Sequence, residues 1–135
     1  MKMLFILMFL PAFAIAADLS GKWYTENIQD PPVQFIKVGK VFHFHSQERV
    51  IFQDGRLSHT IDQNVTLSRI SETEFQGLVS FYDSRGCTFK DLEVMAEFQD
   101  DNTLNVLMTV PRYQYGRNCL LLETVQVPVQ LKRLQ

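Results

Sequence analysis

The sequence has little of what marks a membrane-spanning, nucleic-acid-binding or metal-binding protein. Its leading apolar run, Leu4 to Leu10, is shorter than the roughly 20 residues that cross a bilayer. The 13 Lys and Arg residues are scattered among 15 Asp and Glu residues, so they form no basic stripe that would neutralise phosphates. The two cysteines lack the short spacing of a zinc site. We therefore expect no transmembrane segment in the mature chain, no nucleic-acid partner and no cofactor.

Helix patterns and catalytic motifs are also missing. No segment carries a sustained 3.6-residue apolar period, and no connection is long enough for a crossover helix, which argues against a parallel sheet. Ser80 and Ser84 do not lie in a Gly-x-Ser-x-Gly elbow. Asp100 and Asp101 match hairpin turns better than a pair of catalytic carboxylates. We expect a protein that is not an enzyme and has no catalytic residues.

The amino terminus is typical of a secretory leader. One positive charge, Lys2, precedes the apolar run, and Ala14-Ile15-Ala16 offers small residues for a peptidase. The sequence thus predicts a signal peptide over residues 1–16 and a single mature domain over residues 17–135, exported to a periplasm or secreted. In an oxidising compartment Cys87 and Cys119 are expected to form a disulfide, which constrains the unfolded chain by about 3 to 4 kcal/mol.

Turn-forming residues divide the mature chain into segments of strand length. Asp54-Gly55 and the sequence Asp83-Ser84-Arg85-Gly86 are typical of hairpin turns, and residues 46–48 and 62–64 have a similar composition. Two of the early segments are compatible with a single bent strand. The predicted strands cover residues 21–27, 33–38, 40–46, 49–53, 56–61, 64–70, 74–82, 87–98, 103–113 and 119–132.

Apolar residues at every second position give these strands one buried face. The final strand shows this most clearly, with Glu123 as the one interruption in the series Cys119, Leu121, Val125, Val127, Val129 and Leu131. Three earlier strands carry the same alternation in the sets Phe75, Val79, Phe81; Leu92, Val94, Ala96, Phe98; and Leu104, Val106, Met108, Val110. Such a meander predicts an all-β, antiparallel up-and-down barrel of 8–10 strands. A two-sheet β-sandwich is the alternative.

The opening of the mature chain, with Gly21-Lys22-Trp23, resembles the first strand of the lipocalin and wider calycin families. In those barrels the tryptophan packs across the closed end, often against an arginine from a late strand. The resemblance implies that Trp23 and Arg133 have these barrel-closing roles. It also implies a small barrel that holds a ligand in its interior.

Two charged residues fall on strand faces that are otherwise apolar. Glu123 interrupts the final series, and Arg112 continues the inward set of the strand before it. A buried charge has to be paired, so the two are predicted to act as polar anchors in a ligand cavity, unless a bulge turns Glu123 to solvent. Tyr82, Tyr113 and Phe81 flank turns, where they either line an opening that binds the ligand, with Met108 inside, or simply cover the core.

The histidines offer a further hypothesis. His43 and His45 share one face of a strand, and His59 lies on a nearby one, which is compatible with a three-imidazole metal site or with surface histidines. The leading hypothesis remains an exported, non-catalytic barrel that holds a small apolar or amphipathic molecule. The alternative is a solid barrel that binds another protein through its loops or outer face, as an envelope factor, adhesin or inhibitor does.

Overall fold

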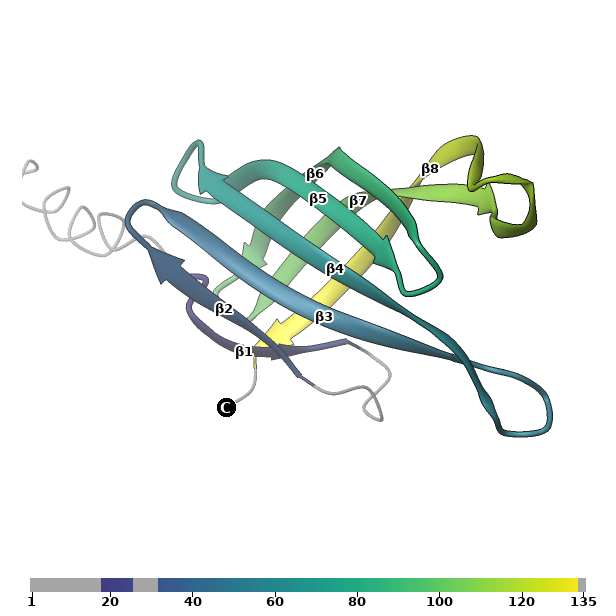
Figure 1. Ribbon diagram of the computed structural model, residues 1–135. Coiled ribbons are helices and arrows are strands. Elements are labelled where there is room, and N and C mark those ends of the chain that lie inside the picture. Colours follow the sequence, from purple (N-terminus) through teal and green to yellow (C-terminus); the bar gives the residue numbers. More distant parts are fainter. Residues whose placement is uncertain (1–17, 26–31, 134–135) are drawn as a thin grey trace, which may run out of the picture.

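The computed structural model shows an all-β protein whose eight antiparallel strands follow one another around a closed barrel (Figure 1). Residues 18–25 and 32–133 are described. The strands are β1 (Gly21–Tyr24), β2 (Val33–Val38), β3 (Val41–Ile51), β4 (Leu57–Arg69), β5 (Glu74–Asp83), β6 (Cys87–Asp100), β7 (Thr103–Gln114) and β8 (Leu120–Arg133), and a short 3-10 helix, η1 (Tyr115–Arg117), follows β7. The predicted up-and-down barrel is confirmed and the sandwich alternative is wrong. The predicted signal peptide, residues 1–16, lies outside the described residues.

The number of strands falls at the low end of the prediction because four predicted strands merge into two. Residues 46–48 and 62–64, predicted as turns, lie in the middle of β3 and β4 and face each other across the ladder, as in the pair Gln47 and Asp62. The Gln47 Nε2 donates a hydrogen bond of 2.9 Å to Asp62 Oδ1. Polar residues that favour turns in isolation are accommodated here because the ladder satisfies their backbone groups.

Trp23 closes one end of the barrel. Its side chain is fully buried, and its Nε1 donates a hydrogen bond of 2.9 Å to the carbonyl oxygen of Leu19. The guanidinium of Arg133 lies 4.3 Å from the Trp23 ring, which matches the packing that the lipocalin resemblance implied. Arg133 also donates hydrogen bonds to the carbonyl oxygens of Asp18 and Ser20, at 2.7 and 3.2 Å. We call this the closed end; the β2–β3, β4–β5 and β6–β7 turns surround it.

Aromatic rings fill the interior next to the closed end. The ring centroids of Trp23 and Phe98 are 6.0 Å apart, those of Phe98 and Phe75 5.7 Å, and those of Phe75 and Phe42 5.8 Å. The inward sets predicted on β5, β6 and β7 all belong to this core or pack against it. The closed half of the barrel is therefore solid, as expected where large side chains fill an eight-stranded barrel.

Gly77 allows β4 and β5 to approach closely in this core. A Cβ atom at this position would lie 1.7 Å from the carbonyl oxygen of Thr66 and 2.7 Å from its carbonyl carbon. Both contacts involve backbone atoms, which cannot move aside without breaking the ladder. A residue with a side chain is therefore not tolerated at this point of β5.

We predict that Arg133→Ala lowers the free energy of unfolding by about 2 kcal/mol, because three backbone carbonyls lose a charged donor and Trp23 loses its cover. Urea unfolding measures the change. Arg49→Ala, at an exposed position of β3, is the control and should change stability by less than about 0.5 kcal/mol. Equal losses in the two variants would contradict the proposed role of Arg133.

Candidate functional site

The end of the barrel opposite Trp23 leaves inward apolar side chains exposed. Along β7, Leu104 is 0% and Val106 7% exposed, whereas the next two inward residues are half-buried. Along β8, exposure rises from 5% at Leu131 to 37% at Val127. We call this the open end; it is formed by the β3–β4 loop, the β5–β6 turn and the β7–β8 connection. The interior is thus sealed at one end and accessible at the other.

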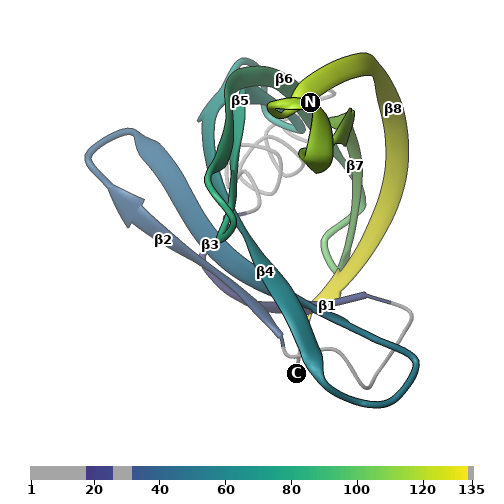
Figure 2. The same ribbon diagram turned by 45° about the vertical axis from the view of Figure 1, so that its right-hand side comes forward.

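The short first strand explains this asymmetry. β1 pairs with β8 through Trp23 and Tyr24, whose partners are Arg133 and Lys132. β3 pairs with β2 as far as His43. Within residues 18–25 and 32–133, the rest of β8 is therefore paired with β7 alone, and the rest of β3 with β4 alone. Figure 2 shows β1 as the short link between β8 and β2.

The hydrogen-bonded ladder of the barrel is also interrupted between β6 and β7. Their ladder ends at the pair Val94 and Met108, so in the described structure residues 87–89, 92 and 93 pair with β5 only, and residues 109–114 pair with β8 only. Asp91 lies in the left-handed region, with φ of 60°, and its N–H donates a hydrogen bond to Ser80 Oγ at 3.1 Å, which marks an irregularity in β6. The β5–β6 and β7–β8 hairpins therefore need other contacts to hold them together.

A buried carboxylate, Asp83, supplies one of these contacts. Asp83 is 5% exposed and lies at the end of β5. Arg85 donates three hydrogen bonds to it, from the backbone N at 2.8 Å, from Nε at 3.0 Å and from Nη2 at 2.7 Å. The Tyr113 hydroxyl on β7 donates a fourth, to Asp83 Oδ2 at 2.6 Å. Asp83 thus links the β5–β6 turn to β7 in the region where β6 and β7 are no longer paired.

The same turn is also bound to β4. The backbone N–H of Ser84 donates a hydrogen bond of 2.9 Å to the carbonyl oxygen of Thr60. The backbone N–H of Thr60 in turn donates one of 3.0 Å to Ser84 Oγ. The β5–β6 turn therefore connects three parts of the open end: β4, β5 with β6, and β7.

The pKa values of Asp83 and Tyr113 in this cluster are shifted in opposite directions. The Arg85 guanidinium, followed by the Tyr113 hydroxyl, holds the pKa of Asp83 well below its usual range despite burial. Burial, followed by the hydrogen bond to the Asp83 carboxylate, raises the pKa of Tyr113 to about 12. At neutral pH the cluster consists of a carboxylate, a guanidinium and a neutral phenol.

The disulfide between Cys87 and Cys119 provides the second connection between the two hairpins, as predicted. The Cα atoms are 5.5 Å apart, well under the roughly 10 Å expected for residues two strands apart. Asn118 and Cys119 both have left-handed φ values, 56° and 57°, directly after η1. This curl of the chain brings Cys119 across to Cys87.

Four predicted ligand-binding residues occupy different positions around the open end. Met108 is half-buried on the inward face of β7, and Phe81 is a core residue at 4% exposure. Tyr113 is bound to Asp83 and packs on Phe89, with ring centroids 4.7 Å apart. Tyr82 is half-buried on the opposite face of β5 from Phe81. Of the four, Met108 therefore lies on the partly exposed inward surface, opposite Val127.

The buried placement predicted for Arg112 and Glu123 is wrong. The two residues are directly opposite each other in the β7–β8 ladder, and Arg112 Nη1 lies 3.4 Å from Glu123 Oε2. Their side chains are 64% and 54% exposed, because this part of the hairpin extends beyond the point at which β6 leaves the barrel wall. The pair is a surface salt bridge, worth at most about 1 kcal/mol.

The three histidines do not converge. His43 and His45 are exposed on β3, where they face Thr66 and Asn64, and the described residues contain no group of three His, Cys, Asp or Glu that could hold a metal ion. His59 lies elsewhere, with its Nε2 3.8 Å from Asp83 Oδ2.

A serine, a histidine and an aspartate lie close together at the open end, but the histidine and the aspartate are not hydrogen-bonded to each other. Ser58 Oγ lies 2.8 Å from Nδ1 of His59. The 3.8 Å between His59 Nε2 and Asp83 Oδ2 exceeds hydrogen-bonding distance, and Arg85 and Tyr113 already bind that carboxylate. The cluster therefore holds the strands together, with His59 within ion-pair distance of Asp83 but not hydrogen-bonded to it.

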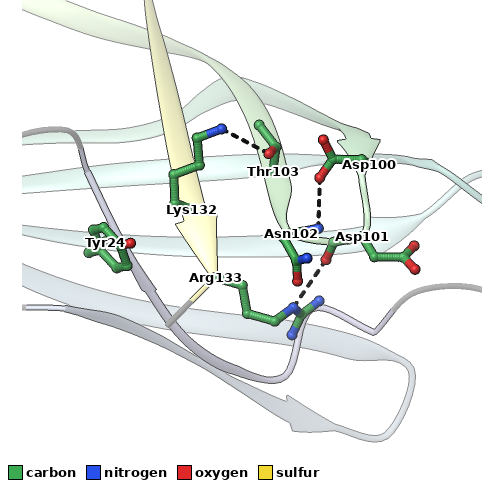
Figure 3. A pocket seen from close by; sticks show the side chains of 7 residues that line it. All are labelled: Tyr24, Asp100, Asp101, Asn102, Thr103, Lys132 and Arg133. Carbon is green, nitrogen blue, oxygen red and sulfur yellow. Dashed lines mark hydrogen bonds between the residues drawn. The ribbon is translucent and has the colours of Figure 1, made fainter. Parts of the chain in front are cut away.

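A polar hollow of about 520 Å³ lies on the outer surface at the closed end, over β1, β7 and β8 (Figure 3). It is lined by Tyr24, Asp100, Asp101, Asn102, Thr103, Lys132 and Arg133. Lys132 Nζ donates a hydrogen bond of 3.0 Å to Thr103 Oγ1, and Asp100 Oδ1 accepts one of 2.9 Å from the backbone of Asn102. These groups are bound to one another, so the hollow offers little for an apolar ligand.

The sequence-based prediction missed Asp83 and Arg85 as a pair. Both residues were assigned to a turn, which they do form, and nothing in their spacing shows that the carboxylate is buried. The available signal was the basic residue Arg85, two positions after Asp83 and two positions before the disulfide cysteine Cys87. Comparisons of the chain with protein-family profiles, curated proteins and solved structures find no match. No helix among residues 18–25 and 32–133 is long and apolar enough to cross a membrane.

We predict that replacing both cysteines, Cys87→Ser with Cys119→Ser, lowers the free energy of unfolding by about 3 to 4 kcal/mol, because the bridge closes a long loop in the unfolded chain. Guanidinium unfolding of the oxidised protein and of the double variant measures the difference. Adding a reductant should weaken the oxidised protein to the same extent and leave the variant unchanged. A variant as stable as the oxidised protein would contradict this role.

The Asp83 cluster should make stability depend on pH at both extremes. Because the folded pKa of Asp83 lies below the unfolded value of about 3.9, its contribution is present above about pH 4 and is lost as the pH falls further. The contribution of Tyr113 is present below about pH 10 and is lost between about pH 10 and 12, because folding raises its pKa. Thermal unfolding across pH should show a smaller acid loss in Asp83→Asn and a smaller alkaline loss in Tyr113→Phe. Unchanged profiles would contradict the coupling.

Proposed function

We propose that this protein is a non-catalytic binding protein that holds a small apolar or amphipathic molecule at the open end of a lipocalin-like barrel. The observation that carries the proposal is the exposed inward surface, where the side chain of Val127 is 37% exposed although it points into the barrel. Water-accessible apolar surface inside a barrel closed at its other end is a suitable site for a molecule of this kind. Met108, opposite Val127 in the ladder, belongs to the same surface.

The polar groups around this surface are compatible with an amphipathic ligand. Arg112 lies two residues beyond the half-buried Val110 on the same face of β7, so a charged end of the ligand would meet it as its chain lies against the interior. Arg112 is only loosely held by Glu123, at 3.4 Å, and is free to exchange this partner for a carboxylate of the ligand. In this proposal Arg112 contacts the ligand from an exposed position.

Kinship with lipocalins and export from the cytoplasm are part of the same proposal. Eight antiparallel strands in sequential order, a buried tryptophan in the first strand and an arginine stacked on it from the last strand support the kinship. The leader sequence predicted at residues 1–16 and the disulfide between Cys87 and Cys119 support export, because such bonds persist in oxidising compartments.

A matched pair of substitutions tests ligand binding. Val127 and Leu107 have nearly the same exposure, 37% and 36%, but Val127 points inward and Leu107 outward. We predict that Val127→Gln weakens binding of a fluorescent fatty-acid analogue by about tenfold, because a polar group replaces apolar contact surface. Leu107→Gln should leave the affinity unchanged. Fluorescence titration measures both, with unlabelled fatty acids and retinoids as competitors.

Two results would contradict the proposal. One is equal weakening by both substitutions, which would place the probe outside the barrel. The other is a wild-type protein that binds no probe from a broad panel and carries no adduct of a few hundred daltons in native mass spectrometry. That result would favour the solid barrel that binds another protein.

A further inference from the structure

The loops of the open end expose a group of large apolar side chains. Exposed fractions lie between 42% and 54% for Ile51, Phe52 and Leu57 at the β3–β4 hairpin and for Tyr115, Leu120, Leu121 and Leu122 at the β7–β8 hairpin. We call these two groups the hairpin tips. Single exposed apolar residues are common, but a cluster of this size usually marks an interaction surface.

The two hairpin tips lie at the same end of the molecule and on opposite sides of it. In Figure 1 both hairpins extend beyond the β5–β6 turn, at the lower and upper right of the view. The 45° turn of Figure 2 brings both of them forward. Two separate apolar projections do not form one continuous patch for a protein partner, whereas a flat and fluid surface can contact both at once.

Each tip has a defined shape that keeps its apolar side chains outward. In the β3–β4 loop, the backbone N–H of Gly55 donates a hydrogen bond of 2.9 Å to the carbonyl oxygen of Phe52. The backbone N–H of Phe52 donates one of 2.8 Å to the carbonyl oxygen of Arg56. In the other tip the disulfide at Cys119 fixes the start of β8. Little conformational freedom therefore remains to be lost on docking.

The charged groups next to the tips leave a small positive excess. The Arg56 guanidinium lies 5.1 Å from the Phe52 ring, and that of Arg85 lies 4.2 Å from the Tyr115 ring. Arg117 adds a further cation in η1. The aspartate in the β3–β4 tip, Asp54, is already paired with Arg56 at 2.6 Å. The whole chain has a formal net charge of −2, whereas the three arginines here face two aspartates, Asp54 and the Asp83 that binds Arg85, which leaves one positive charge.

Aromatic and aliphatic side chains with arginines beside them suit the boundary between lipid headgroups and acyl chains. The apolar groups insert into the outer part of the acyl layer, while the guanidinium groups remain at the level of the headgroups and attract anionic lipids. We propose that the two hairpin tips dock on the surface of a bilayer that contains anionic lipids, so that the open end of the barrel faces the membrane. This docking does not require the ligand-binding function proposed above, although it would bring the open end close to a source of amphipathic molecules.

Co-sedimentation with vesicles of phosphatidylcholine and phosphatidylglycerol tests the docking. The tip variant carries Phe52→Ser and Leu122→Ser, at side chains that are 49% and 54% exposed. The control variant carries Leu78→Ser and Met95→Ser, which are 45% and 50% exposed on the outer face of β5 and β6. The wild-type protein, the tip variant and the control variant are all purified from the exported fraction, and circular dichroism checks that each is folded.

We expect the wild-type protein and the control variant to sediment with the vesicles equally, and the tip variant to lose at least about tenfold in apparent affinity, since two apolar side chains no longer insert. Vesicles of phosphatidylcholine alone should bind the wild-type protein more weakly, because the arginines lose their anionic partners.

Absence of wild-type binding, or equal losses in the two variants, would overturn the proposal. So would a concentration-dependent dimer that the tip variant abolishes, since the tips would then contact a second copy. Fatty-acid titration without vesicles should be unaffected in the tip variant, which separates this test from that of the proposed function.

Discussion

The length of β1 is the constraint on which the rest of the structure depends. Its four residues are the only connection in the described ladder between β8 and β2, so they close the barrel where they lie and nowhere else. Trp23 and Arg133 occupy this point, and the hydrogen bonds from Arg133 fix the segment before β1 across the end of the barrel. A longer first strand would extend the wall along β8 and bury the inward surface that the proposed function requires.

Where the backbone ladder ends, side-chain bonds hold the open end together. The buried carboxylate of Asp83 binds Arg85 and Tyr113, and the disulfide joins the same two hairpins a short distance away. Arg85 contributes twice, because its guanidinium also lies over the ring of Tyr115. An opening that is held rigidly loses little entropy when a ligand or a membrane contacts it, which is the physical advantage of this arrangement.

Much of the fold was predictable because alternation of apolar and polar residues is a local property. The inward sets of β5, β6 and β7 follow directly from it, and so does the antiparallel order of strands joined by short turns. The merging of predicted strands in β3 and β4 was not predictable in the same way. Gln47 and Asp62 are typical turn residues, and only their pairing across the ladder places them inside strands.

The site was harder to predict than the fold. The alternation of side chains shows that Val110 and Arg112 lie on the same face of β7. It does not show that β6 no longer pairs with β7 at this point, so that Arg112 is exposed. Asp83 presents the opposite problem, because a turn aspartate is expected at the surface and this one is buried by partners from other strands. Both errors arise because burial depends on where neighbouring strands end.

The antiparallel meander, the inward face of most strands and the disulfide partners could be predicted from the sequence, and the lipocalin resemblance pointed to Trp23 and Arg133 at one end of the barrel. Each of these follows from local periodicity, from the number of cysteines or from a short motif. The opening at the other end of the barrel, the exposure of Arg112 and Glu123, and the central place of Asp83 in the contacts there became apparent only from the folded structure. These properties depend on the lengths of ladders between strands far apart in the chain, and the pattern within a single strand carries no information about them.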